Sequence, residues 1–150
     1  MNVFNGGGCV GYVHGCGDWI GGIAIGSPRV CLAGGLTVGR RIEVKNRKLA
    51  VEEEGHIIKF VERVYKIVFS GKYAVEEGKE LLYLTKRAVF KLTPSGVEPV
   101  EEALGVNLER DTLGKMEFRL VIQRVEEMDR GIFREGKMGL REEALKIVRE

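Results

Sequence analysis

Residues Leu82–Thr93 read LYLTKRAVFKLT, two runs rich in aromatic and branched apolar residues that are separated by two basic ones. Runs of this kind favour strands. We expect one strand over Glu80–Thr85 and a second over Ala88–Thr93. Pro94-Ser95-Gly96 then signals a turn, and residues Gly96–Glu102 provide a third strand. The stretch therefore predicts a three-stranded meander.

Upstream of the meander, weaker patterns predict a hairpin and a further strand. Two short alternating runs, Arg41–Val44 and Lys48–Glu52, lie on either side of Asn46, which indicates a hairpin. Arg63–Phe69 is β-branched and aromatic and ends at a Ser-Gly pair. This composition is typical of a strand.

Three segments suit helices. Tyr73–Lys79 could form a short helix that is stopped by the glycine within it. Asn107 or Asp111 could cap a helix that runs to about Met116. The last residues, Leu140–Glu150, have apolar side chains at helical spacing. Alternating strands, a meander and two or three helices predict the α/β class.

Glycine is concentrated at the start of the chain, where twelve of the 21 glycines lie within the first 39 residues. Such a density disfavours regular helices and strands. Residues 1–40 are therefore expected to form loops around one or two short strands, and residues 41–150 the α/β body. We treat residues 1–150 as a single domain or part of one.

Composition excludes several classes of protein. Apolar residues make up 44% and charged residues 31%, so a core can form. No apolar run reaches the ~18–20 residues that cross a bilayer, and the start has no secretory signal pattern. Lys+Arg number 24 against 22 Asp+Glu, which argues against a dedicated nucleic-acid binder. Abundant charge with a single Gln suggests, as a hypothesis, heat adaptation.

The cysteines Cys9, Cys16 and Cys31 are odd in number, which indicates a reducing, cytoplasmic setting rather than a disulfide framework. A metal site that uses them with His14 is the alternative. However, the C-x₆-C and C-x₁₄-C spacings differ from the short paired spacings of structural zinc sites. Free, partly buried thiols are the simpler interpretation, and we predict no metal.

Gly6–Gly11 matches the pattern G-x-G-x-x-G. A dinucleotide site also requires a preceding strand and a following helix. Only five residues come before the match, and the glycine-rich residues 14–22 cannot form a good helix. We interpret the match as accidental.

Gly15-Cys16-Gly17-Asp18-Trp19-Ile20 is a more informative turn. Backbone N–H groups around tightly turned glycines can form a concavity for an anion and can stabilise a developing oxyanion. A purely structural turn is the alternative. The glutamates, in contrast, occur in clusters that we expect to be solvated surface, and none has the setting of a buried, activated carboxylate: Glu52–Glu54, Glu76-Glu77, Glu101-Glu102, Glu126-Glu127 and Glu142-Glu143.

The Gly15–Ile20 turn resembles the Gly-Cys-Gly-Gly-Phe-Ile loop of the acyl-CoA:acetate/propionate (3-oxoacid) CoA-transferases. Residues 82–93 resemble the family's YITERAVFELT stretch. Further segments resemble the family in the same order and spacing over about residues 15–140: Ile67–Ala74, Met116–Arg119, Met128–Arg134 and Met138–Leu140. Family members have two related α/β halves of the open-sheet type, and this chain resembles the carboxy-terminal part of the second.

The resemblance implies covalent catalysis by a glutamate carboxylate, which attacks the acyl-CoA thioester and carries CoA as a glutamyl thioester. That glutamate lies in a Glu-x-Gly-type turn upstream of the loop. Residues 1–14 do not offer it, so we expect no catalytic residue in this chain. CoA or acyl-CoA is implied as substrate, with no covalently bound cofactor.

The same resemblance implies that the loop Gly15, Gly17, Asp18 faces the thioester carbonyl, with the amides of Gly17 and Asp18 receiving the oxyanion. Asp18 replaces a family glycine, and its carboxylate would repel the oxyanion unless it points away. The Gly34, Gly35 and Arg40 segment resembles a family turn loosely and could line the CoA channel, and an ordinary surface role for the arginine is the alternative.

We therefore expect a CoA-transferase-type protein that acts on an acyl-CoA and a small carboxylic acid. It would be inactive alone and would need a partner chain, because the nucleophilic glutamate is missing. A second chain or a homo-oligomer is also expected because a partial domain leaves an unpaired sheet edge and exposed apolar surface. Two alternatives remain: a non-catalytic CoA-binding or interaction module, including a decayed remnant, and a metal or redox protein that uses the cysteines.

Overall fold

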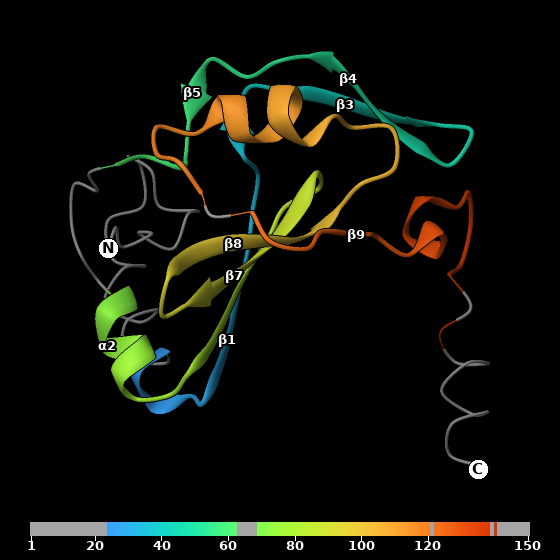
Figure 1. Ribbon diagram of the computed structural model, residues 1–150. Coiled ribbons are helices and arrows are strands. Elements are labelled where there is room, and N and C mark those ends of the chain that lie inside the picture. The colour runs from blue at the N-terminus through green and yellow to red at the C-terminus, as the bar shows by residue number, and fades with distance from the viewer. Residues whose placement is uncertain (1–23, 63–68, 121, 139, 141–150) are drawn as a thin grey trace, which may run out of the picture.

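The computed structural model describes residues 24–62, 69–120, 122–138 and 140 (Figure 1). A five-stranded mixed sheet runs in the order β1-β6-β7-β8-β9, with two separate two-stranded sheets, β2-β5 and β3-β4. The strands of the large sheet are β1 (Arg29–Ala33), β6 (Glu80–Leu84), β7 (Ala88–Thr93), β8 (Gly96–Glu102) and β9 (Glu126–Glu127). The small sheets consist of β2 (Thr37–Val38), β5 (Ile57–Ile58), β3 (Arg41–Lys45) and β4 (Lys48–Glu53).

The predicted meander is confirmed. β6 pairs antiparallel with β7, and β7 pairs antiparallel with β8. The hydroxyl of Thr85 closes the first turn, since it donates to the Ala88 carbonyl at 2.7 Å and accepts from the Ala88 amide at 3.0 Å. The second turn ends at Gly96, whose φ of +134° suits glycine.

The predicted hairpin is also confirmed, as β3 paired with β4. Its two turn residues, Asn46 and Arg47, have φ values of 52° and 60°. Two consecutive left-handed residues are typical of the type I′ turn, which matches the twist of the strands. Asn at the first position tolerates this conformation well, which explains why the turn forms there.

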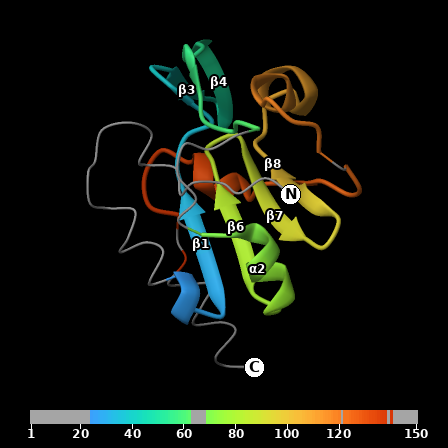
Figure 2. The same ribbon diagram turned by 90° about the vertical axis from the view of Figure 1, so that its left-hand side faces the viewer.

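Two parallel pairings make the sheet mixed. β1 pairs parallel with β6, and β9 pairs parallel with β8. Figure 2 shows β1 beside β6, so strands from the glycine-rich segment and from the body lie in one sheet. The prediction of one or two short strands in residues 1–40 is confirmed by β1 and β2. Within the described residues, β1 forms one edge of the large sheet.

The short helix lies slightly earlier than predicted. Helix α2 (Gly71–Glu76) begins after Ser70, whose hydroxyl accepts from the Tyr73 amide, and the chain leaves it through Gly78 with φ +65°. Asn107, rather than Asp111, caps the next helical segment, because its side chain accepts from the Arg110 amide.

That segment is a π-turn followed by a 3₁₀ turn, η2 (Leu108–Thr112) and η3 (Leu113–Lys115). Another 3₁₀ turn, η4 (Arg130–Phe133), follows β9. The predicted strand at residues 63–69 and helix at residues 140–150 lie almost wholly outside the described residues.

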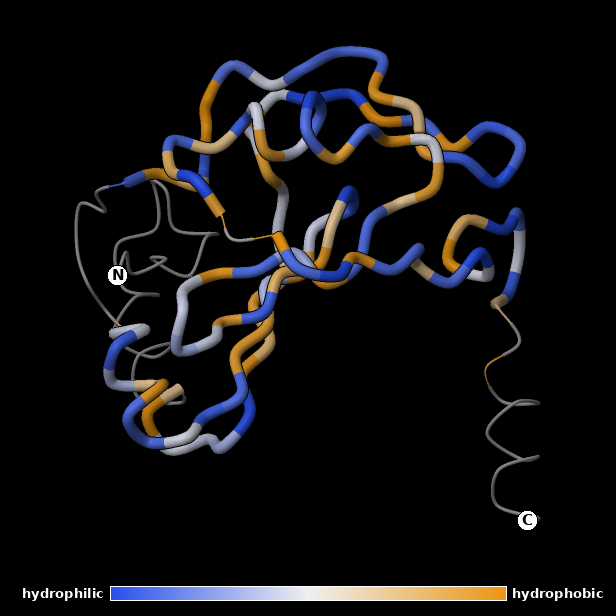
Figure 3. The backbone as a smooth tube through the Cα atoms, viewed as in Figure 1, coloured by the Kyte–Doolittle hydropathy of each residue, from blue (hydrophilic) through white to orange (hydrophobic). Residues whose placement is uncertain are grey.

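The sheet carries a core on each face. The larger cluster contains the inward-facing residues of β6 and β7 together with Phe60, whose ring centroid lies 5.2 Å from that of Phe90. The smaller cluster joins Leu49 of the hairpin to Met128 and Phe133. Figures 1 and 2 place α2 against one face and η4 on the other. Figure 3 shows the hydrophobic colour running along the central strands. Among the described residues, no helix is long and apolar enough to span a bilayer.

Candidate functional site

The segment Gly34–Arg40 leaves the carboxyl end of β1 and turns over the neighbouring strand. The Gly34 amide donates to the Leu84 carbonyl at 2.9 Å, which extends the pairing of β1 with β6 by one residue. In open α/β sheets, ligands bind beyond the carboxyl ends of parallel strands. This turn therefore occupies the position in the sheet where a ligand is expected.

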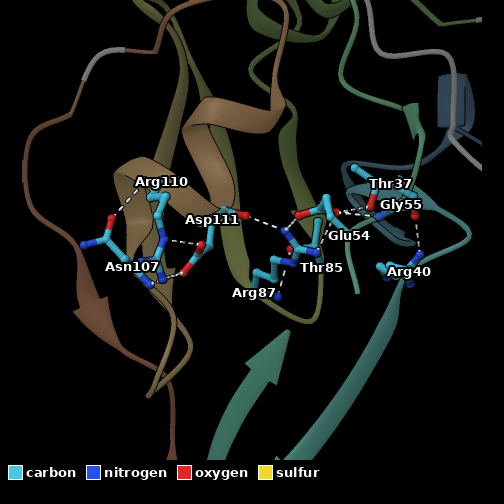
Figure 4. A network of polar contacts seen from close by, with 9 residues as sticks. All are labelled: Thr37, Arg40, Glu54, Gly55, Thr85, Arg87, Asn107, Arg110 and Asp111. Carbon is cyan, nitrogen blue, oxygen red and sulfur yellow. Dashed lines mark hydrogen bonds and ion pairs between the residues drawn. The ribbon is translucent and has the colours of Figure 1, made fainter. Parts of the chain in front are cut away.

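The structure brings the predicted residues Gly34, Gly35 and Arg40 together. A Cβ atom at Gly35 would overlap the guanidinium group at the end of the flexible Arg40 side chain, so a larger residue there would displace the guanidinium. The Nη1 atom of Arg40 donates to the Thr37 carbonyl (Figure 4). Arg40 thus closes the turn by folding back over it.

The turn contains β2, and two further glycines lie where β2 pairs closely with β5. Gly39 has φ +83°, and a Cβ there would lie 2.7 Å from the Cε1 atom of His56. A Cβ at Gly55 would overlap the Val38 carbonyl and the Thr37 side chain. The His56 amide donates to that same carbonyl at 3.1 Å. The left-handed φ of Gly39 and the close backbone approach at Gly55 therefore favour glycine at these two positions.

A buried ion pair fixes this region to the meander (Figure 4). Arg87, between β6 and β7, is 1% exposed. Its Nη1 and Nη2 atoms donate to the two carboxylate oxygens of Glu54 at 2.8 and 2.9 Å. Its Nη1 atom also donates to the Asp111 carbonyl of η2 at 2.5 Å. One side chain therefore joins the small β2–β5 sheet, the large sheet and η2.

The Glu54 carboxylate is fully occupied. Besides Arg87, its Oε1 atom accepts from the Thr37 hydroxyl at 2.7 Å and from the Gly55 amide at 2.9 Å. The pKa of Glu54 is lowered from 4.5 to about 2, mainly by the hydrogen bonds from Arg87 and to a smaller extent by those from Thr37 and Gly55, against the opposing effect of burial. Glu54 therefore stays ionised at neutral pH and is too weakly basic for a general base.

Most of the described glutamates lie on the surface, as predicted, but Glu54 does not. It was grouped with the solvated run Glu52–Glu54, whereas the structure makes it the half-buried partner of Arg87. A buried arginine requires a carboxylate, but Lys86 and Lys91 stand in the same stretch as Arg87, and no local pattern shows which of the three cations is buried.

The other predicted site residues lie outside the described residues. These are the loop residues Gly15, Gly17 and Asp18, together with Cys9, His14 and Cys16 of the alternative metal site. Cys31 lies exposed on β1. Within the described ranges, no group of three or more His, Cys, Asp or Glu residues could hold a metal ion.

An apolar cavity of about 490 Å³ opens beside the turn. Gly34 and the residues that end β6 form one wall, and the hairpin and η4 form the others. Cavities of this size with a few polar groups suit small organic ligands. The polar groups are Thr85, Lys86 and Glu101; the apolar lining residues are Ala33, Ile42, Val44, Leu49, Leu84, Val89, Met128, Ile132 and Phe133.

Comparison with curated proteins identifies clear relatives. The chain is 39% identical over 113 residues to a caffeate CoA-transferase of Acetobacterium woodii, covering 75% of this chain and 22% of that protein. It is 38% identical over 131 residues to the acetate CoA-transferase YdiF of Escherichia coli K12, covering 86% of this chain and 24% of that protein. The chain thus spans about a quarter of the relatives' length. No protein-family model matches it.

The comparison with solved structures agrees with the comparison of sequences. The crystal structure of the acyl-CoA transferase YdiF apoenzyme from Escherichia coli O157:H7 matches with a TM-score of 0.75 at 38% identity. The match covers 78% of this chain and 23% of that one. A crystal structure of the same enzyme as a thioester complex with CoA matches equally well. The open α/β sheet and the resemblance expected from the sequence are both confirmed: in sequence and in fold the chain is similar to CoA-transferases over about a quarter of their length.

Proposed function

We propose that this chain is part of a CoA-transferase that moves CoA between an acyl-CoA and a short-chain carboxylic acid. The observation that carries the proposal is the joint match of sequence and fold to enzymes named for this reaction, one of which was solved as a thioester complex with CoA. The turn at the carboxyl ends of β1 and β6 supports the proposal, because it is built of glycines and lies next to a ligand-sized cavity.

The chain supplies the oxyanion and CoA side of the pocket. The loop Gly15, Gly17, Asp18 offers backbone amides to the thioester carbonyl, and the Gly34–Arg40 turn lines the path of CoA. Amides fixed before charge develops stabilise an oxyanion without reorganisation. The Arg40 guanidinium, which lies over Gly35 and donates to the Thr37 carbonyl, supports the second part of this assignment.

The nucleophilic glutamate comes from a segment that these 150 residues do not contain. Its carboxylate oxygen attacks the thioester carbonyl, the CoA thiolate leaves, and an acyl-glutamyl anhydride forms. The thiolate then attacks the glutamyl carbonyl and releases the first acid. The resulting glutamyl-CoA thioester passes CoA to the second acid by the same two steps in reverse.

Among the described carboxylates, Glu54 is adjacent to the turn, but it is a poor nucleophile. Both of its oxygens are engaged by Arg87, and these contacts together with the hydrogen bonds from Thr37 and Gly55 hold its pKa near 2. It serves the site by holding the turn in place. This is consistent with a nucleophile that lies on another segment.

A complementation assay tests the proposal. The purified chain is mixed with acetyl-CoA and propionate, alone and together with YdiF that lacks the quarter aligned with this chain, and propionyl-CoA is measured. We expect no sustained transfer by either polypeptide alone and transfer by the mixture.

Sustained transfer by the isolated chain would refute the proposal that the nucleophile comes from another polypeptide. A mixture that associates and binds CoA but transfers nothing would favour the non-catalytic CoA-binding module instead. A control mixture uses complementing YdiF whose nucleophilic glutamate is replaced by glutamine, which should abolish transfer without preventing association.

A further inference from the structure

Thr37 on β2 contacts Glu54 through its side chain and Arg40 through its backbone (Figure 4). Its hydroxyl donates to the Oε1 atom of Glu54 at 2.7 Å. Its carbonyl accepts from the Nη1 atom of Arg40. Thr37 is fully buried, so bulk water does not compete for the hydroxyl. One buried residue therefore connects the Arg87–Glu54 ion pair to the guanidinium that lies over Gly35.

The hydroxyl contact fixes the direction of the Thr37 side chain. Threonine is branched at Cβ and has few rotamers open to it. Its acceptor is fixed as well, because Arg87 binds both oxygens of Glu54 and the Gly55 amide binds one of them. A hydrogen bond to a charged acceptor is stronger than one to a neutral acceptor. The side chain therefore anchors the backbone of Thr37 in addition to the pairing of β2 with β5.

The guanidinium of Arg40, in contrast to that of Arg87, is bound by a neutral group. No ion pair involves Arg40 within the part of the chain that the structure describes, and the Glu54 carboxylate is already neutralised by Arg87. A carbonyl orients a guanidinium without cancelling its charge. Arginine has several N–H donors in a fixed geometry, and the Thr37 carbonyl takes one of them. The charge of Arg40 is thus oriented but left available to an anion.

We propose that Thr37 is a positioning residue of the transferase, which acts through Arg40. It holds the guanidinium in place along the turn without neutralising it, so that the charge faces an anionic substrate. This inference rests on the proposed function and deepens it, because it assigns a role in the reaction to a buried side chain that contacts no substrate. The two arginines beside the turn thus differ in purpose: Glu54 neutralises Arg87 to stabilise the fold, whereas Thr37 keeps Arg40 charged and oriented.

Steady-state kinetics of the complemented mixture test the proposal with acetyl-CoA and propionate. Thr37→Val keeps the shape of the side chain but removes the hydroxyl, whereas Thr37→Ser keeps the hydroxyl. In Thr37→Val, the KM for acetyl-CoA should rise about fivefold, the factor that one hydrogen bond corresponds to, and kcat should stay the same. Thr37→Ser should restore the parent KM. The KM for propionate should change in neither variant, because the turn is assigned to CoA and not to the acid.

Arg40→Gln completes a double-mutant cycle. Because Thr37 acts through Arg40, Thr37→Val should raise the KM no further in a chain that already carries Arg40→Gln. The matched control is Thr93→Val, which removes a hydroxyl that donates to the Glu98 carboxylate at 2.8 Å, at the end of β7 away from the turn. It should leave both KM values unchanged. An equal effect of Thr37→Val in both backgrounds, or an equal effect of the control, would overturn the inference.

A second measurement needs no transfer of CoA. Nitrogen-15 NMR of the 150-residue chain measures hydrogen exchange at the Arg40 guanidinium, which a hydrogen-bonded acceptor slows. Exchange should be faster in Thr37→Val than in the parent, and Thr37→Ser should match the parent. Unchanged exchange in Thr37→Val would overturn the inference, and the proposed function would survive, because it depends on transfer by the mixture. A parent mixture that transfers nothing would overturn the proposed function, and the exchange rates would still decide whether Thr37 holds Arg40.

Discussion

Replacing Glu54 by glutamine should destabilise the fold strongly at neutral pH. The substitution keeps an oxygen for the Thr37 hydroxyl and the Gly55 amide, but it removes the charge that faces Arg87. Arg87 is 1% exposed and cannot reach water. An uncompensated charge would remain buried, and breaking a buried pair in this way costs about 3–5 kcal/mol.

The pKa of Glu54 gives an independent magnitude. The carboxyl group titrates near 4.5 in the unfolded chain and near 2 in the folded one. Because the folded pKa is the lower, the pair stabilises the fold fully above about pH 4.5, and this stabilisation is lost as the pH falls toward 2. The difference corresponds to about 3 kcal/mol at neutral pH. The Glu54 side chain is 28% exposed, so the lower end of the range is expected.

Urea denaturation followed by circular dichroism measures the loss. The control is Glu52→Gln, two residues earlier and on β4, where the ion pair with Lys45 is exposed to solvent. Exposed pairs contribute little, so the control should lose much less stability than Glu54→Gln. The gap between the parent and Glu54→Gln should close between about pH 5 and pH 2.

A loss at Glu54→Gln no larger than that of the control would refute the reasoning. A difference in the free energy of unfolding between the parent and Glu54→Gln that does not change with pH would also refute it. The paired replacement Arg87→Met with Glu54→Leu provides a further check, because an apolar pair of similar size often matches a buried ion pair in stability. It should recover most of the stability that Glu54→Gln loses.

Three other substitutions test how the site is supported. Gly55→Ala should cost about 1–3 kcal/mol in urea denaturation, because a Cβ there overlaps Thr37, whereas Gly26→Ala, which meets nothing within 4 Å, should not. Phe90→Ala should lower the free energy of unfolding by about 3–5 kcal/mol, since the ring is fully buried; a loss below 1 kcal/mol would contradict the core assignment. Asn107→Ala should cost about 1 kcal/mol through the lost cap on η2, and Asn107→Asp should restore it.

The local elements could be predicted from the sequence because short-range signals specify them. The alternation in Ala88–Thr93, the turn signal at Pro94–Gly96 and the asparagine at position 46 each act within a few residues. The meander and hairpin followed directly. Helix α2 begins two residues earlier than predicted, because Ser70 caps it. The Ser70-Gly71 pair also suits the end of a strand, so the sequence alone does not identify it as a cap.

The parallel pairings could not be predicted in this way. β1 and β6 are separated by some fifty residues and carry no local signal for their partner. The pairing of Arg87 with Glu54 is also long-range, with 33 positions between the two residues. The site required both, since the turn Gly34–Arg40 is positioned by the parallel pair and held by the ion pair. The sequence indicated the residues of the turn, but it did not indicate the parallel pairing and the ion pair that position the turn.

The central claim is that this chain contributes the CoA side of the pocket while the nucleophile lies elsewhere. Mass spectrometry of the complemented mixture after a pulse of acetyl-CoA, digested under acidic conditions, tests it most directly. A glutamyl-CoA thioester should appear on a peptide of the complementing polypeptide and on none from this chain. A CoA adduct on any carboxylate of the 150 residues would contradict the claim.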